Sequence, residues 1–155
     1  MDICKHILIA APADDIWPLI TELDQIIKWN QSIVSSVAVS DGPIQKGFRS
    51  RLVLKEGNRE VEYQEEVLSY EYLKAVEIQM SGGSLGKNPM NVRYDLVSEG
   101  NGTSVTQRCT WKPSGLLLHL VAPIIAKSSA KSLDDNLVKL KKYAEAKVGE
   151  SKDES

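Results

Sequence analysis

Few side chains in this sequence have the types and spacing that chemistry requires. The two histidines and two cysteines are His6, His119, Cys4 and Cys109. They form neither Cys-x-x-Cys nor His-x-x-x-His, the spacings at which metal ligands recur. No nucleophile lies beside a base in a recognisable catalytic pattern. The sequence therefore predicts no metal site, no cofactor and no catalytic dyad or triad.

Glu65 is the carboxylate with the most informative position. It lies on the same alternating face of a predicted strand as Val61, Tyr63 and Val67. If this face is the concave face of a sheet, Glu65 is a buried acid with a raised pKa and a candidate general base or polar anchor. If the strand lies at an edge, the same carboxylate is simply solvated. Both interpretations remain open from the sequence.

The loop GGSLGKN (82–88) has the glycines of a phosphate-binding loop but not its spacing. Three residues separate Gly82 from Gly86, where that motif has four, and Asn88 follows the lysine in place of Ser or Thr. The loop also joins two apparently antiparallel strands. We expect a flexible gate beside a cavity or an ordinary hairpin loop, and no phosphate site.

These residues are positioned by a simple series of elements. A short strand at 3–9 precedes two short helices, the first beginning near Pro12 and containing Pro18, the second at 23–29. Alternating apolar residues separated by turn sequences then predict about six antiparallel strands. These strands are expected near 37–39, 48–55, 60–67, 75–80, 90–97 and 105–111. A long helix over 115–145 completes an α+β two-layer fold.

The long helix changes character along its length. Residues 116–126 are apolar almost all round, 127–132 are small and polar, and the later part carries a core-facing stripe that includes Leu133, Leu137 and Leu140. An apolar segment followed by small residues suits a helix that covers an internal cavity with sparse polar groups. His119 would then lie at the mouth of that cavity. Alternatively, the small residues allow close packing and no cavity exists.

Length and composition exclude several classes of protein. The chain has 155 residues, 42% of them hydrophobic and 26% charged, with a formal net charge of −2. A nucleic-acid-binding protein is usually basic, with a clustered patch. The eleven apolar residues 116–126 are too few to span a membrane, which takes about 20. We expect a cytoplasmic protein with reduced cysteines, one domain over 1–148 and a disordered tail over 149–155.

Two segments resemble the SRPBCC superfamily, which includes START-like and birch-pollen-allergen-like proteins. One is ICKHILIAAPADDIWPLITELDQIIKWNQSIVSSVAV, and the other is GNGTSVTQRCTWKPSG with the helix that follows it. The resemblance covers about residues 3–147 and is strongest to the polyketide cyclase/dehydrase and lipid-transport group. It implies a helix-grip fold, in which a curved antiparallel sheet of about seven strands wraps a long C-terminal helix, with two short helices after the first strand. The resemblance also places the first and last strands side by side.

The resemblance further implies a hydrophobic cavity between the sheet and the C-terminal helix. By position, the residues expected to line it are Trp29, Phe48, Leu52, Tyr63, Ile78, Tyr94, Trp111, Ile125, Ser129 and Asn136. The expected function is binding or transport of a small hydrophobic molecule by a monomer or weak dimer. The alternative is a cyclase, dehydratase or hydrolase acting on a polyketide-like or aromatic substrate. Scarce histidines and the lack of paired inward acids favour a binding protein over an enzyme.

Overall fold

The computed structural model describes the backbone of residues 1–112 and 114–153, and the side chains of this part except 116–119, 121–122 and 151–153. Its elements follow the predicted order. They are β1 (Asp2–Ile9), α1 (Ala13–Thr21), α2 (Leu23–Trp29), β2 (Ile33–Ala38), β3 (Arg49–Glu56), β4 (Arg59–Glu71), β5 (Ala75–Ser81), η1 (Gly83–Leu85), β6 (Met90–Glu99), β7 (Gly102–Trp111) and α3 (Leu116–Asp153).

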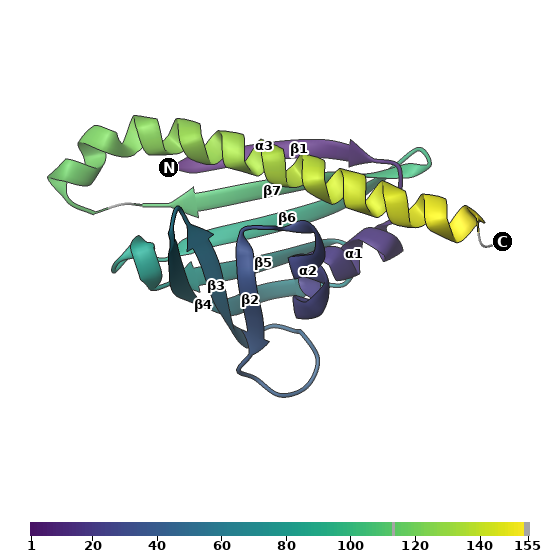
Figure 1. Cartoon of the computed structure of the whole chain (residues 1–155), viewed down its shortest axis with the longest axis horizontal. Helices are drawn as coiled ribbons and strands as arrows, with labels where there is room; N and C mark the ends of the chain where they lie inside the picture. Colours follow the sequence, from purple (N-terminus) through teal and green to yellow (C-terminus); the bar gives the residue numbers. More distant parts are fainter. Residues whose placement is uncertain (113, 154–155) are drawn as a thin grey trace.

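The seven strands form one antiparallel sheet in the order β1-β7-β6-β5-β4-β3-β2. Consecutive strands from β2 to β7 are neighbours, as expected for a meander, and β1 pairs with β7 from the other end of the sequence. The N-terminal ammonium donates a 2.7 Å hydrogen bond to the Trp111 carbonyl, which fastens this pair. The predicted helix-grip arrangement is confirmed (Figure 1).

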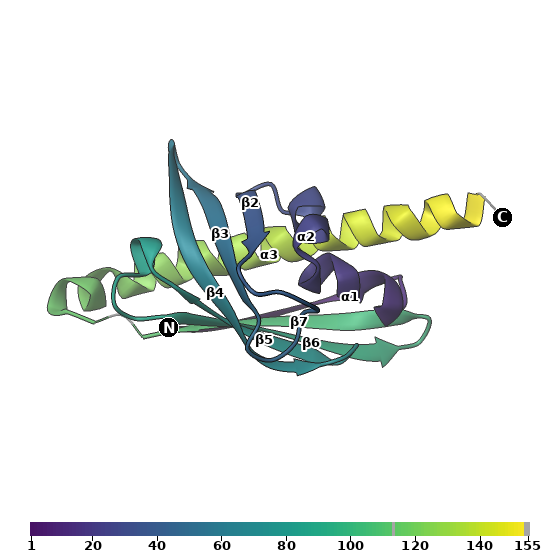
Figure 2. The ribbon, with the colours of Figure 1, turned by 90° about the horizontal axis from the view of Figure 1, so that it is seen from below.

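The sheet is strongly curved. Figure 2 shows β2, β3 and β4 rising out of the plane of β5–β7 toward the side that holds the helices. The strand register shifts between Val67 and Ser69 in β4, and between Ile33 and Ser35 in β2. Such irregularities bend a strand and increase its twist. The concave side thereby gains the depth needed to enclose side chains.

Alternation in β3, β4 and β6 correctly predicted which face is buried, since Leu52, Tyr63 and Tyr94 all lie on it. The strand expected near 37–39 is instead β2 at Ile33–Ala38, and Val37 and Val39 are exposed. The main core joins the buried face to α1 and to the C-terminal half of α3, where Leu137, Leu140 and Ala144 are almost fully buried. These core contacts fix the helices against the sheet. As predicted, Pro12 directly precedes α1, and Pro18 lies inside it.

The two halves of α3 pack differently. Among its described residues, those that join a hydrophobic cluster begin at Ala130. Leu120 and Ile124, in the apolar half, are each 72% exposed. These two side chains therefore do not roof the sheet as the sequence pattern suggested. The helix runs to Asp153. The disordered tail over 149–155 is not tested by this assignment and stays a prediction.

The two cysteines lie close together in the sheet but on opposite faces. Cys4 pairs across the β1–β7 ladder with Arg108 and is exposed, whereas Cys109 pairs with Ile3 and is buried. Both are free thiols, and burial raises the pKa of Cys109 to about 11. Because neighbouring residues on a strand point to opposite faces, a bond between these sulfurs is geometrically disfavoured.

Candidate functional site

A small apolar pocket lies between the two short helices and strands β2–β5. Its volume is about 60 Å³. The side chains that line it come from α1, α2, β2, the loop between β2 and β3, and the concave faces of β3, β4 and β5. They are Ile20, Thr21, Leu23, Ile26, Ile33, Ser36, Ile44, Phe48, Ser50, Leu52, Glu65, Val67, Val76 and Ile78. None of the described residues of α3 is among them.

An open groove of about 780 Å³ lies directly outside this pocket. The pocket and the groove share Leu23 on α2, Ser36 on β2, and Ile44 and Phe48 beside the β2–β3 turn. These four side chains separate the enclosed space from solvent. The approach to the pocket therefore passes between α2 and the 39–48 loop, which hangs below the sheet in Figure 1.

Glu65 supplies the ionisable group of this pocket. It is partly buried on β4, opposite Ser50 of β3 and Met80 of β5. Burial raises the pKa of its carboxyl to about 7, against a smaller opposing effect of the Ser50 hydroxyl, which lies 3.4 Å from Oε1. Near neutral pH the carboxyl therefore exchanges between its protonated and ionised forms, whereas an ordinary glutamate is ionised, and it can donate or accept a proton.

Ser36 adds a second polar group to the same pocket. Its hydroxyl is buried, and it has no hydrogen-bond partner within the described structure. A buried hydroxyl without a partner is energetically costly, so its presence calls for an explanation such as a bound molecule. Thr21, Ser36, Ser50 and Glu65 are thus the polar side chains in a lining that is otherwise apolar.

Three of the ten predicted ligand-binding residues line this pocket: Phe48, Leu52 and Ile78. Ile125, Ser129 and Asn136 are partly buried on α3 and do not line it. A ligand role for those three helix residues stays a prediction. His119, predicted at a cavity mouth, lies outside the described side chains.

The other four predicted ligand-binding residues, all aromatic, are buried elsewhere in the fold. Trp29 donates a 2.7 Å hydrogen bond from Nε1 to the Leu19 carbonyl, which holds α2 against α1. The Trp111 indole donates to the Asn88 carbonyl at 3.1 Å. Tyr94 belongs to the main core, and burial raises its pKa. A ligand role for these residues and for Tyr63 also remains a prediction.

Tyr63 and the glycine-rich loop 82–88 are in contact with each other, away from the pocket. The Tyr63 hydroxyl donates to the Glu56 carboxylate, and the Ser84 hydroxyl donates to the same group at 2.7 Å. Gly83, at φ +52°, approaches so closely that an added Cβ would lie 2.6 Å from the Tyr63 ring. The loop is therefore tied to the β3–β4 hairpin, and its residues do not line the pocket.

Sequence reasoning missed the part of the pocket that faces the groove. Ser36 follows the irregularity in β2, which interrupts the period-two pattern from which its direction would have been predicted. Ile44 lies in a loop, where no periodicity applies. One signal was available for this region: Ser50 lies two residues from both Phe48 and Leu52, which places the three on the same face of the strand expected near 48–55.

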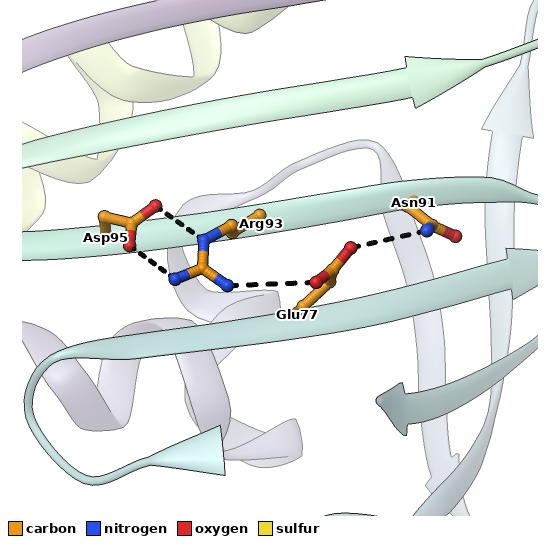
Figure 3. A network of polar contacts seen from close by, with 4 residues as sticks. All are labelled: Glu77, Asn91, Arg93 and Asp95. Carbon is orange, nitrogen blue, oxygen red and sulfur yellow. Dashed lines mark hydrogen bonds and ion pairs between the residues drawn. The ribbon is translucent and has the colours of Figure 1, made fainter. Parts of the chain in front are cut away.

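The outer face of the sheet carries a polar network that faces solvent (Figure 3). Arg93 donates two 2.9 Å hydrogen bonds to Asp95 and lies 3.8 Å from Glu77, to which the Asn91 amide also donates. Exposed ion pairs of this kind contribute about 1 kcal/mol or less. Arg93 and its acidic partners therefore form part of a solvated surface.

Potential metal ligands do not cluster in the described part of the chain. No three His, Cys, Asp or Glu side chains there come together in a way that could hold a metal ion. His6 is exposed on β1.

Solved structures with the same fold are numerous and distant in sequence. A Thermus thermophilus protein, TTHA0849, is 18% identical, with a TM-score of 0.76 over 94% of this chain and 98% of that one. A START superfamily protein from Mycobacterium smegmatis is 16% identical, with a TM-score of 0.76 over 94% and 97%. A Thalictrum norcoclaurine synthase mutant in complex with a transition-state analogue is 18% identical, with a TM-score of 0.70 over 93% of both chains.

The comparison with family models is more specific than the comparison of folds. No curated protein sequence matches the chain significantly. The model of the family described as polyketide cyclase / dehydrase and lipid transport matches residues 3–145. This match covers both resembling segments, the sheet, the pocket and most of α3. The chain therefore belongs to the polyketide cyclase/dehydrase and lipid-transport family of the SRPBCC superfamily.

Proposed function

We propose that this protein binds a compact, largely apolar molecule carrying one hydrogen-bonding group, in the pocket between α2 and strands β2–β5. The observation that carries the proposal is that one apolar pocket contains both a partly buried carboxyl, Glu65, and a buried hydroxyl without a partner within the described structure, Ser36. Small-molecule sites have this composition, with mostly apolar linings and few polar groups. Membership of a family described in part by lipid transport also supports it.

The size of the pocket constrains how binding occurs. Pockets for drug-sized ligands measure about 300–1,000 Å³, whereas this one measures about 60 Å³. A ligand larger than a few atoms therefore requires Leu23, Ile44 and Phe48 to move apart, which would join the pocket to the outer groove. Movement of the 39–48 loop relative to α2 provides that opening.

An enzyme of the cyclase, dehydratase or hydrolase type is the second candidate function. The observation favouring it is Glu65 itself, because a carboxyl with a pKa of about 7 suits general acid–base catalysis at neutral pH. Norcoclaurine synthase, a relative in fold, is an enzyme. Against catalysis, Glu65 is alone as an ionisable group among the described residues that line the pocket.

Filling the pocket tests whether it binds anything. Ser36→Leu places an isobutyl group into the space without removing a hydrogen bond, because the Ser36 hydroxyl has no partner within the described structure. Ser129→Leu is the matched control, since Ser129 is partly exposed on α3 and outside the pocket. We expect the fluorescent probe 1-aminoanthracene to bind the wild type and the Ser129→Leu variant, and to lose at least about tenfold affinity for Ser36→Leu.

The opposite pattern would contradict the proposal. If a folded Ser36→Leu protein binds the probe as well as the wild type, and Ser129→Leu does not, the site lies under α3, where the family resemblance first placed it. Circular dichroism of both variants checks that each is folded.

The Glu65→Gln variant separates carrier from enzyme. Glutamine keeps the shape of the side chain and removes its ability to titrate. In an enzyme that uses Glu65 as acid or base, turnover of an aromatic or polyketide-like substrate falls about 10²–10⁴-fold with little change in binding. In a carrier, affinity for the probe changes modestly and no turnover that depends on Glu65 exists.

A further inference from the structure

The apolar end of α3 presents hydrophobic side chains to solvent. Leu120 and Ile124 are four residues apart, each is 72% exposed, and Pro123 beside them is also exposed. The stripe continues along the helix to Lys127 and Lys131, which are exposed as well. One helix face therefore changes from apolar to basic within about two turns.

The charge around this segment is unusual for the chain. Residues 100–133 contain no Asp or Glu, although the protein as a whole has a formal net charge of −2. Lys112 lies just before the apolar segment, and Lys127 and Lys131 lie just after it. An apolar segment between Lys112 and Lys127, with the nearest acidic residues of the helix, Asp134 and Asp135, about two turns beyond Lys127, is complementary to an anionic, amphipathic surface.

The position of the segment in the fold makes it accessible. In Figure 1 this end of α3 extends beyond the ends of β1 and β7. The described α3 residues that pack into the protein core begin at Ala130. No described helix is long and apolar enough to cross a membrane.

We propose that the apolar end of α3 docks the protein on anionic lipid membranes. Leu120 and Ile124 enter the boundary between headgroups and acyl chains, to which interfacial helices penetrate about 5–10 Å. At about 1.5 Å per residue, Lys131 lies about 10 Å along the axis from Ile124, and Lys127 about 5 Å. Both lysines can therefore remain among the anionic headgroups while the apolar tip is buried.

The membrane surface is favoured over a second copy of the chain as the partner. Two copies meeting through this end would bring their Lys112 and Lys127 side chains together, about two helical turns away from the nearest carboxylates of the helix, Asp134 and Asp135. An anionic bilayer supplies both the apolar layer and the negative charge. Docking requires no ligand in the pocket, so it is separable from the proposed binding function.

Flotation with lipid vesicles tests the proposal directly. We expect the full chain to bind phosphatidylcholine vesicles that contain about 30% phosphatidylserine, and to bind pure phosphatidylcholine vesicles at least about tenfold more weakly. Added salt should weaken the binding to the anionic vesicles. Leu120→Ser combined with Ile124→Ser should reduce binding about tenfold or more. The matched control is Val37→Ser with Val97→Ser, because these valines are 56% and 63% exposed elsewhere.

Several outcomes would overturn the inference. One is failure of the wild type to bind anionic vesicles, and another is an equal loss of binding in the control pair. A third is a concentration-dependent dimer in light scattering that Leu120→Ser with Ile124→Ser abolishes, without vesicle binding, since the surface would then join two copies. All the substituted residues are exposed, and circular dichroism verifies that each variant is folded.

Discussion

Replacing Glu65 with glutamine should change how the stability of the protein depends on pH. The folded-state pKa of Glu65 is about 7 because burial disfavours its charged form, compared with an ordinary value of 4.5. Between these values the folded state holds a proton that the unfolded state has released, so the wild type loses stability as pH rises from about 4.5 to about 7. At about 1.4 kcal/mol per pH unit this corresponds to about 3.5 kcal/mol. Partial exposure of the side chain reduces the expected effect to about 2–3 kcal/mol.

Urea unfolding followed by tryptophan fluorescence measures this effect. We expect the free energies of unfolding of Glu65→Gln and wild type to be similar near pH 4.5. By about pH 8 the free energy of unfolding of Glu65→Gln should exceed that of wild type by about 2–3 kcal/mol. Glu66→Gln is the matched control, because Glu66 is the next residue along β4 and its carboxylate lies on the solvent side, 3.9 Å from Arg49. A free-energy difference between Glu65→Gln and wild type that stays constant across this pH range would refute the burial of the carboxyl.

Three further predictions concern the fold. Cys4 should react quickly with a thiol reagent in the native protein and Cys109 only after unfolding, giving two free thiols in unreduced protein; a disulfide in fresh protein would contradict this. Gly83→Ala should lower the free energy of unfolding by about 1–3 kcal/mol, because the added Cβ would collide with the Tyr63 ring. An unchanged urea midpoint would exclude that contact. Leu140→Ala should cost about 2–5 kcal/mol in urea unfolding and Leu120→Ala almost nothing, and equal costs would mean that both ends of α3 are packed.

The sequence was a reliable guide wherever periodicity and turn residues agree. Alternation in β3, β4 and β6 correctly identified the inward faces that contain Leu52, Tyr63 and Tyr94. The spacing of Leu133, Leu137 and Leu140 likewise identified the buried stripe of α3. These patterns succeed because a strand or helix with one face in water must place its apolar residues at a fixed period.

The pocket could not be located in the same way. Its position depends on the bends in β2 and β4 and on the distance between α2 and the 39–48 loop, none of which is encoded in a local pattern. The apolar residues 116–126 suggest a helix that covers the cavity, because a helix that is apolar on all sides is usually buried in a globular protein. The exposure of Leu120 and Ile124 shows that hydrophobicity alone does not say which surface covers a helix.

The most direct test of the proposed site is a nuclear magnetic resonance titration of isotope-labelled protein with 1-aminoanthracene. A pocket between α2 and β2–β5 predicts saturable shifts centred on the amides of Leu23, Ser36, Ile44 and Glu65, with small changes along α3. Largest shifts at Ile125–Asn136 of α3, or no saturable shifts anywhere, would contradict it.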